Sequence, residues 1–476
     1  MAERYWIETL GCPKNQVDSD KLVGKLVADG YEPAGTPERA DLVVVNTCAF
    51  IEAARQESVD TVLALSDARR HGARLVVTGC MAERYGDELA EALPEVDLVA
   101  PFGVSLTPRP SHPTTPPGGS PPAGTPVSLV RKPVTAGEPP VPSFDLLNLP
   151  RPATAAPWSY VKVAEGCDRN CGFCAIPSFR GKQRSRSTSS ILAEVDQLGG
   201  PDRLLREVVL VAQDLSSFAL DRSGGRVGSP MDGPAAGGAR PIVDLVGAVA
   251  ERVRWVRLLY LYPSTLDDGL VDAILAAGVP YFDLSLQHVS RPLLKRMRRW
   301  GEGDRFLDRI ASIRASEPTS AFRSSFIIGY PGETEADHDL LLQWLEAAQL
   351  DWVGFFPFSS EAGTHAAGLG DQIDGTLVAE RLRECTELQD GITAVRRDQL
   401  LGATVEVLVD VVGEGRTYRE APEIDGIVNL PDDLPVGSFA EVVITGADGP
   451  DLFAEPACGP DATRTRPLAA PVGTAP

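Results

Sequence analysis

The run Cys167-x3-Cys171-x2-Cys174 constrains this chain more than any other stretch. The gaps between the three thiolates are so short that all three must face one site. A structural zinc ion takes four closed ligands, but no fourth Cys or His lies near the run, and His112 and His288 are far away in sequence. Cysteine thiolates also hold iron-sulfur clusters, and a cluster with only three of them keeps one iron open. The spacing therefore favours an iron-sulfur cluster over a zinc site.

On this motif the central part of the chain resembles the radical S-adenosylmethionine (radical SAM) enzymes. In that family the open iron chelates the amino acid end of SAM. The reduced cluster cleaves SAM to a radical that abstracts hydrogen from an unactivated carbon. The resemblance implies that the cofactor carries the difficult chemistry, while the protein positions and shields it.

A second set of three cysteines follows three short, β-branched runs near the N-terminus. The runs at 5–11, 41–47 and 74–79 lead to Cys12, Cys48 and Cys80, with helix-like segments at 19–30 and 51–72 between them. This spacing matches strand-helix-strand units. The carboxyl ends of parallel strands meet at one edge of an α/β sheet. One cysteine after a strand is commonly just a buried thiol, but three in the same position predict a second cluster with an open iron.

Composition sets the broad class of the protein. A chain of 476 residues is long enough for two or three domains. Six of its eight cysteines fall in the two sets of three, which indicates metal ligation in a reducing compartment rather than a disulfide framework. Cys385 and Cys458 are left over and are interpreted as structural or incidental thiols.

The sequence shows no signal-peptide pattern and no apolar run long enough to span a bilayer, so we expect a cytoplasmic protein without a membrane partner. The net charge of −21 argues against a protein whose main partner is a phosphate backbone, because Lys and Arg dominate such binding. A basic protein partner fits this charge better.

The predicted fold class is α/β, with a doubly wound α/β domain first, a partial (β/α)6 TIM-like barrel in the centre and a small antiparallel β barrel last. The predicted boundaries are 1–103 for the first domain, 158–395 for the central domain and 396–460 for the third. A Pro-rich linker is expected at 104–157 and a disordered tail at 461–476, and a Gly-rich insert at 221–240 is interpreted as a flexible excursion.

Six strand-like runs in the central domain predict a parallel partial barrel with its active site at the carboxyl ends of the strands. They lie at 160–164, 207–212, 255–261, 281–286, 322–328 and 352–358. Polar residues follow several of these runs. From that position we predict SAM contacts for Gln213 and Gln287, and for Arg298 in the basic stretch 291–300.

The third domain, 402–458, shows the two-residue periodicity of a small β barrel. It contains twelve acidic residues against Arg416 and Arg419, a balance of −10. A small β domain that gripped RNA would carry a basic face. The charge therefore does not favour direct RNA binding.

Over nearly its whole length the chain resembles the methylthiotransferases. Cys12, Cys48 and Cys80 match that family's auxiliary cluster ligands, Cys167, Cys171 and Cys174 match its catalytic radical SAM ligands, and the third domain is similar to its TRAM domain. The stretches 174–186, 294–299 and 420–426 are similar to the RimO branch, whose members methylthiolate an aspartate of ribosomal protein S-twelve.

This resemblance implies two 4Fe-4S clusters, SAM, a reducing electron donor and a sulfur donor. It implies that a methylthio group is assembled at the auxiliary cluster, while a radical from SAM takes hydrogen from the aspartate β-carbon. Both clusters must be close and shielded from water. Two alternatives stay open: a tRNA adenosine methylthiotransferase with the same chemistry, and a non-catalytic iron-sulfur carrier, which would need no SAM pocket.

Overall fold

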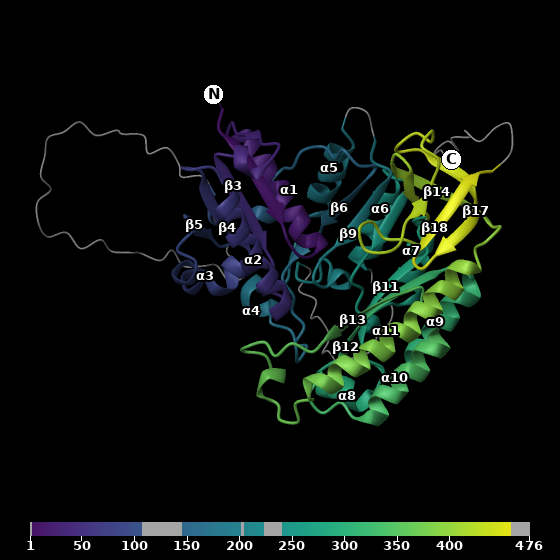
Figure 1. The fold of residues 1–476 in the computed structure, drawn as a ribbon. Coiled ribbons are helices and arrows are strands. Elements are labelled where there is room, and N and C mark those ends of the chain that lie inside the picture. The colour runs from purple at the N-terminus through teal and green to yellow at the C-terminus, as the bar shows by residue number, and fades with distance from the viewer. Residues whose placement is uncertain (1, 107–144, 201–203, 223–239, 458–476) are drawn as a thin grey trace, which may run out of the picture.

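The computed structural model describes residues 2–106, 145–200, 204–222 and 240–457. An N-terminal α/β domain, a central barrel and a C-terminal β barrel follow one another (Figure 1). Most of the predicted linker at 104–157 and of the Gly-rich insert lies outside the described residues, as do Cys458 and the predicted tail. No helix in the described ranges is both long and apolar enough to cross a bilayer.

The N-terminal domain is a five-stranded parallel sheet in the order β2-β1-β3-β4-β5. Its strands and helices are β1 (Arg4–Thr9), α1 (Pro13–Ala28), β2 (Glu32–Pro33), β3 (Leu42–Thr47), α2 (Glu52–Ala68), β4 (Arg74–Gly79), α3 (Cys80–Ala92) and β5 (Leu98–Ala100). All of β3 is buried, as expected for a central parallel strand. Helix α1 begins earlier than the predicted segment at 19–30 because Pro13 occupies its first turn, where a missing N–H costs nothing.

The central domain contains two three-stranded parallel sheets, β10-β9-β6 and β11-β12-β13, joined by a parallel bridge between Leu261 and Leu284. Together they form the predicted six-stranded partial barrel. The strands are β6 (Trp158–Lys162), β9 (Glu207–Val211), β10 (Trp255–Leu258), β11 (Tyr281–Gln287), β12 (Ala321–Ile328) and β13 (Trp352–Pro357). A short hairpin, β7 (Ala164–Glu165) with β8 (Arg184–Ser185), frames the first cysteine motif.

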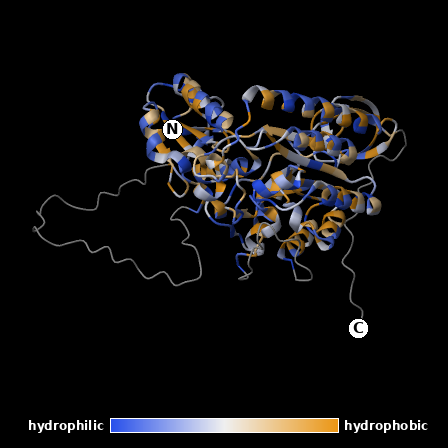
Figure 2. Cartoon of the chain, turned by 90° about the horizontal axis from the view of Figure 1, so that it is seen from below, coloured by the Kyte–Doolittle hydropathy of each residue, from blue (hydrophilic) through white to orange (hydrophobic). Residues whose placement is uncertain are grey.

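Helices cover the outer face of this barrel (Figure 1). They are α5 (Thr188–Gly199), α6 (Pro241–Ala250), α7 (Asp268–Ala276), α8 (Arg291–Arg296), α9 (Gly303–Ser316), α10 (Glu335–Ala348) and α11 (Gly375–Asp398). These helices carry both hydrophilic and hydrophobic residues (Figure 2). Such a mixture is typical of amphipathic helices that turn one apolar face toward the core. The short helix α4 (Ile176–Arg180) instead packs against α3 of the first domain.

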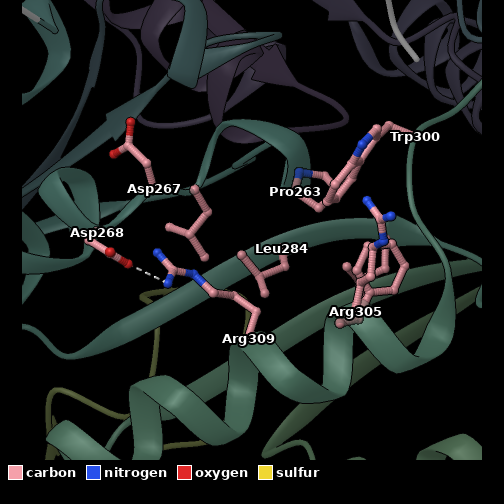
Figure 3. A pocket seen from close by; sticks show the side chains of 10 residues that line it. Pro263, Asp267, Asp268, Leu284, Trp300, Arg305 and Arg309 are labelled. Atoms are coloured by element: carbon pink, nitrogen blue, oxygen red, sulfur yellow. Dashed lines mark hydrogen bonds and ion pairs between the residues drawn. The ribbon is translucent and has the colours of Figure 1, made fainter. Parts of the chain in front are cut away.

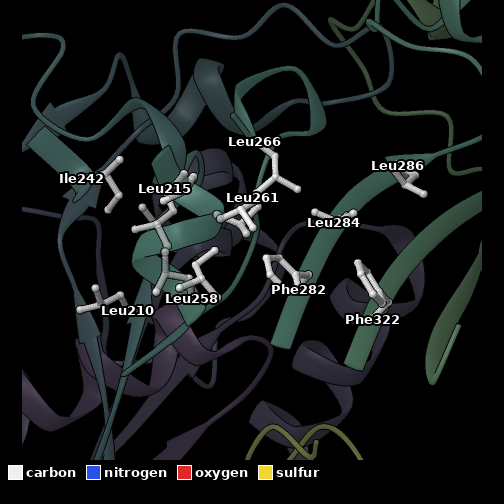
Figure 4. Close-up of a cluster of buried hydrophobic side chains, with 14 of the residues drawn as sticks. Leu210, Leu215, Ile242, Leu258, Leu261, Leu266, Phe282, Leu284, Leu286 and Phe322 are labelled. Carbon is white, nitrogen blue, oxygen red and sulfur yellow. The ribbon is translucent and has the colours of Figure 1, made fainter. Parts of the chain in front are cut away.

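The largest apolar core lies between the outer face of the barrel strands and these helices. Figure 4 shows side chains from successive strands meeting in one layer, among them Leu210, Leu258, Phe282 and Phe322. Alternate residues of the same strands point to the inner face of the barrel, where Tyr160, Val209 and Tyr281 join a second core. That second core also takes in Val17 of α1 and Leu408 of the third domain, so it connects all three domains.

The third domain is a closed barrel in the order β14-β15-β16-β18-β17. Its strands are β14 (Thr404–Val411), β15 (Glu414–Arg416), β16 (Val428–Asn429), β17 (Phe439–Asp448) and β18 (Asp451–Pro456). The predicted barrel was antiparallel throughout, but β16 pairs with β18 in parallel. The odd number of strands causes this difference, because strand directions cannot alternate all the way around a closed barrel of five strands.

That loop, residues 417–427, covers the inner face of the central barrel. Tyr160 Oη donates to the Pro422 carbonyl at 2.7 Å, and Tyr281 Oη donates to Asp425 at 2.6 Å. The Trp352 indole N–H donates to the Arg419 carbonyl at 2.7 Å. The third domain is therefore held against the barrel by directed hydrogen bonds as well as by apolar contact.

A buried ion pair network crosses the same boundary. Glu207 of β9 is fully buried and accepts from Arg257 at 2.7 Å and from Arg416 of the third domain at 2.8 Å. Burial alone would raise the pKa of Glu207, but the two guanidinium groups outweigh it and lower that pKa. The charge of this carboxylate is thus compensated from two domains at once.

We predict that Glu207→Gln destabilises the protein strongly, because Arg257 would lose the carboxylate it pairs with in the buried network and Arg416 would keep only Asp410. The expected loss in the free energy of unfolding is about 3–5 kcal/mol, measured by urea denaturation. Because folding lowers the pKa of Glu207, its carboxylate stabilises the folded protein fully at pH values above the unfolded pKa. The difference in unfolding free energy between variant and parent should therefore shrink as the pH falls through the folded pKa.

Glu387→Gln is the matched control, since Glu387 pairs with Arg383 on the exposed surface of α11. Its loss should stay below about 0.5 kcal/mol. Equal effects of the two substitutions would contradict a special role for the buried network.

Candidate functional site

The loop after β7 presents Cys167, Cys171 and Cys174 to one side. Gly166 has φ +79°, and a Cβ at this position would stand 2.6 Å from the Gly181 carbonyl oxygen, so the tight turn requires glycine. The Cys167 N–H donates to that same carbonyl at 3.1 Å. The hairpin therefore holds the start of the cysteine loop rigidly.

The environment of Cys167 and Cys174 favours the protonated form of these two thiols. Burial raises the pKa of Cys167, and the nearby Asp214 carboxylate raises it further. Burial and the neighbouring Cys171 raise the pKa of Cys174 to about 12. Binding of a metal centre would stabilise the thiolates and release protons.

The second triad lies at the carboxyl edge of the N-terminal sheet. Cys12, Cys48 and Cys80 follow β1, β3 and β4, which are neighbours in that sheet. Gly11 lies so close to Cys48 that a Cβ on Gly11 would be 2.9 Å from the Cys48 Cβ. Burial raises the pKa of Cys48 and of Cys80, and neighbouring thiols of the triad raise both further, so the three thiols share one electrostatic environment.

The donor set of each triad fits a cluster of several irons better than one metal ion. Within the ranges that the structure describes, no three His, Cys, Asp or Glu side chains are arranged to hold a single ion. In a cluster each thiolate binds a different iron, so the sulfurs need not converge on one point. Three soft sulfur donors without a fourth protein ligand also match a cluster with an open iron.

Arg180 links the N-terminal triad to the segment that leads into the second triad. Its Nη2 lies 2.9 Å from Cys80 Sγ and 2.8 Å from Asn15 Oδ1, while its Nη1 lies 2.8 Å from Glu165 Oε1. Glu165 is only two residues before Cys167. Burial would raise the pKa of Glu165, but Arg180 and Lys162 outweigh it and hold that pKa well below its usual range.

A second buried arginine, Arg299, contacts the other triad. Arg299 donates to Cys171 Sγ at 3.2 Å and also to the Ser285 carbonyl. Its guanidinium packs against the Tyr262 ring at 4.4 Å, and Arg169 packs against the same ring at 3.9 Å. Positive charge therefore lies close to the sulfur ligands of both triads.

The three residues predicted to contact SAM lie in different surroundings. Gln213 donates to Glu165 Oε1 at 2.7 Å, and its own side-chain oxygen is buried without a hydrogen-bond partner within the described residues. Gln287, the last residue of β11, is partly buried and has φ +71°. Arg298 is exposed and lies 3.0 Å from His365 Nδ1.

Reasoning from the sequence did not single out Arg180, Arg299 or Lys14. Lys14 is buried in α1, with its ammonium 3.3 Å from the centre of the Tyr260 ring on the barrel. Arg180 lies in the stretch 174–186 and Arg299 in the stretch 294–299. Each stretch contains several arginines, and the local sequence does not indicate which of them is buried beside a cysteine. Only the spatial neighbours of each side chain make that choice.

A cavity of about 380 Å³ lies elsewhere on the barrel (Figure 3). It lies between η4 (Pro263–Thr265), α7, β11 and α9, and contains none of the residues predicted for the site. Its lining residues are Pro263, Leu266, Asp267, Asp268, Leu284, Leu286, Trp300, Arg305, Phe306 and Arg309. The ion pair between Arg309 and Asp268 spans one of its walls (Figure 3).

Comparison with known proteins identifies each part of this arrangement. Residues 4–101 match the family model described as "Uncharacterized protein family UPF0004", residues 161–345 match "Radical SAM superfamily" and residues 401–456 match "TRAM domain". Among solved structures, the radical S-adenosylmethionine methyltransferase TsrM from Kitasatospora setae aligns with a TM-score of 0.41 at 15% identity over 75% of this chain and 72% of that one. That likeness is too low to carry an argument.

Relatives of known function match almost the whole chain. A protein of Streptomyces coelicolor named "Ribosomal protein uS12 methylthiotransferase RimO" is 40% identical over 95% of this chain and 96% of its own length. Proteins of the same name from Salinispora tropica and Frankia casuarinae are 40% and 38% identical and cover 95% and 98% of this chain, with 95% of each relative covered. The chain therefore belongs to the RimO family of radical SAM methylthiotransferases.

Proposed function

We propose that this protein transfers a methylthio group to the β-carbon of an aspartate in ribosomal protein uS12. The observation that carries the proposal is the position of Arg180 at the boundary of two domains, where it contacts Cys80 of one triad and Glu165, two residues before Cys167 of the other. The names of the relatives add the substrate. Because that substrate belongs to the ribosome, we place the enzyme in the cytoplasm.

We assign Cys12, Cys48 and Cys80 as ligands of an auxiliary 4Fe-4S cluster, and Cys167, Cys171 and Cys174 as ligands of the radical SAM cluster. When bound, these clusters supply an electron for the cleavage of SAM and an iron site that carries sulfur. The chain itself provides the thiolates, keeps them partly or fully buried and holds their two domains together. Gln213, Gln287 and Arg298 remain our proposed SAM contacts.

The domain boundaries of 1–103, 158–395 and 396–460 also remain proposals. The described end of the segment at 104–157 packs against the first domain. Lys21 of α1 donates to the carbonyls of Leu147 and Leu149 at 2.8 and 3.0 Å, and Leu147 is buried. This segment therefore supports the docking of the first domain on the barrel.

The acidic balance of the third domain supports a protein substrate less strongly than the sequence count suggests. Asp410 pairs with Arg416, Glu420 with Arg397 and Asp425 with Arg323, all in internal positions. The exposed acids include Glu414, Asp432, Asp433 and Glu441. Their surface is still acidic, which suits a basic protein and disfavours a phosphate backbone. An electron donor and a sulfur donor complete the proposed partners.

The substrate is tested by mass spectrometry of intact small-subunit ribosomal proteins from cells with and without this gene. We expect uS12 alone to lose the mass of one methylthio group when the gene is absent, and Cys171→Ala to fail to restore it. Nucleoside analysis of tRNA from the same cells is the control. A methylthioadenosine that disappears from tRNA while uS12 stays unchanged would assign the alternative substrate.

The cluster assignment is tested by the iron content of the purified, anaerobically reconstituted chain. Replacing any one of the six assigned cysteines by alanine should remove about half of the bound iron, because one of two clusters loses a ligand. Cys385→Ala is the matched control: Cys385 is fully buried in α11, so its thiol should be irrelevant to iron. Unchanged iron in Cys80→Ala would contradict the auxiliary site.

A further inference from the structure

Arg180 divides its hydrogen bonds between the two domains. Nη1 faces carboxylates, with Glu165 Oε1 at 2.8 Å and Asp18 Oδ2 at 3.4 Å. Nη2 faces Cys80 Sγ at 2.9 Å and the amide oxygen of Asn15 at 2.8 Å. One half of the guanidinium is thus anchored on ion pairs, and the other half is turned toward a sulfur of the auxiliary triad.

The charges of Arg180 and Lys162 are balanced by the carboxylates of Asp18 and Glu165, so their balance does not depend on the Cys80 sulfur. Lys162 also pairs with Asp18 and with Glu165, the latter at 2.6 Å, so two cations face two carboxylates in this buried group. Among the described members of this group, only Arg180 donates to Cys80 Sγ. A planar guanidinium can serve two directions in this way, whereas an ammonium acts as a single point charge.

The guanidinium is held in place on its remaining side as well. It lies 4.7 Å from the centre of the Phe102 ring, and its side chain is only 3% exposed. A fixed, buried donor acts more strongly on a nearby sulfur than a mobile, solvated one, because little water screens it.

Each triad has a different buried arginine beside one of its sulfurs. Arg180 Nη2 lies 2.9 Å from Cys80 Sγ, whereas Arg299 donates to Cys171 Sγ at 3.2 Å. A change at Arg180 therefore alters the surroundings of Cys80 without removing the arginine that contacts Cys171.

We propose that Arg180 is a positioning residue that raises the reduction potential of the auxiliary cluster through its hydrogen bond to Cys80 Sγ and fixes that ligand relative to the Glu165–Cys167 loop. Reduction adds negative charge to a cluster, and a charged donor on a ligand sulfur stabilises that state. The proposal rests on the proposed function only in taking Cys12, Cys48 and Cys80 as cluster ligands.

The test is a redox titration of the reconstituted full-length chain, with dithionite as reductant and EPR detection of the reduced cluster. A background with Cys167, Cys171 and Cys174 replaced by alanine reports the auxiliary cluster alone. We expect Arg180→Met to lower the midpoint potential of the auxiliary cluster by at least about 59 mV, which corresponds to a tenfold change in the equilibrium constant of a one-electron reduction. Arg180→Lys should lower the potential by less, because it keeps the charge.

Arg84→Met is the matched control. Arg84 also lies at the interface of these two domains, with its side chain only 9% exposed, and pairs there with Glu361 at 2.7 Å. Its side chain donates to the Ala49 carbonyl and to Glu361 rather than to a cysteine sulfur. Its substitution should leave the potential unchanged. An equal shift in Arg84→Met would assign the effect to domain docking and overturn the proposal, as would an unchanged potential in Arg180→Met. In the reciprocal background lacking Cys12, Cys48 and Cys80, Arg180→Met should not shift the radical SAM cluster.

A second measurement leaves Arg180 unchanged, so it can be made even if Arg180→Met and Arg180→Lys both lose the cluster. In the same auxiliary-only background, labelled with 15N-arginine, pulsed EPR should detect a weak 15N coupling to the reduced cluster. Absence of that coupling would overturn the proposal. Absence of any cluster in this background would instead contradict the proposed function, so the two failures are distinguishable.

Discussion

The buried ion pair group around Arg180 determines how the first domain sits on the barrel. Arg180 and Lys162 come from the barrel, and Asp18 comes from α1, so neither domain compensates its own buried charges completely. Removing one partner from such a group is costly, because the others remain buried and charged. Any other docking of the two domains would pay this cost, and the two cysteine triads therefore meet in one arrangement.

Further contacts reinforce the same arrangement from both sides. Lys21 of α1 pairs with Glu194 of α5 at 3.0 Å in a buried position. Glu361, in the loop after β13, accepts from both Arg55 and Arg84 of the first domain. At the opposite end of the barrel, Glu207 is neutralised by Arg416 of the third domain. Ion pairs thus join the barrel to both neighbouring domains, and these pairs form only when the three domains are packed together.

Much of the architecture could be predicted because its signals are local. Each of the six predicted barrel strands is present, since runs of β-branched residues between polar turns are typical of buried parallel strands. The early start of α1 and the parallel pair of β16 with β18 were not predicted. The start of α1 depends on how the chain turns after β1, and the parallel pair depends on the closure of five strands into a barrel. Periodicity reports neither, because both involve contacts between elements. The internal positions of Asp410, Glu420 and Asp425 were missed for the same reason, since their partners lie on other elements.

The sequence by itself determined the two cysteine triads. For Cys167, Cys171 and Cys174 the short covalent spacing already forces the side chains to one place, and for Cys12, Cys48 and Cys80 the strand-helix repeat brings them to one sheet edge. Only the tertiary structure decided that these two places adjoin, and that Arg180 rather than another arginine contacts Cys80. Those residues are 100 positions apart. Their contact follows from the packing of one domain against another, and no local pattern encodes that packing.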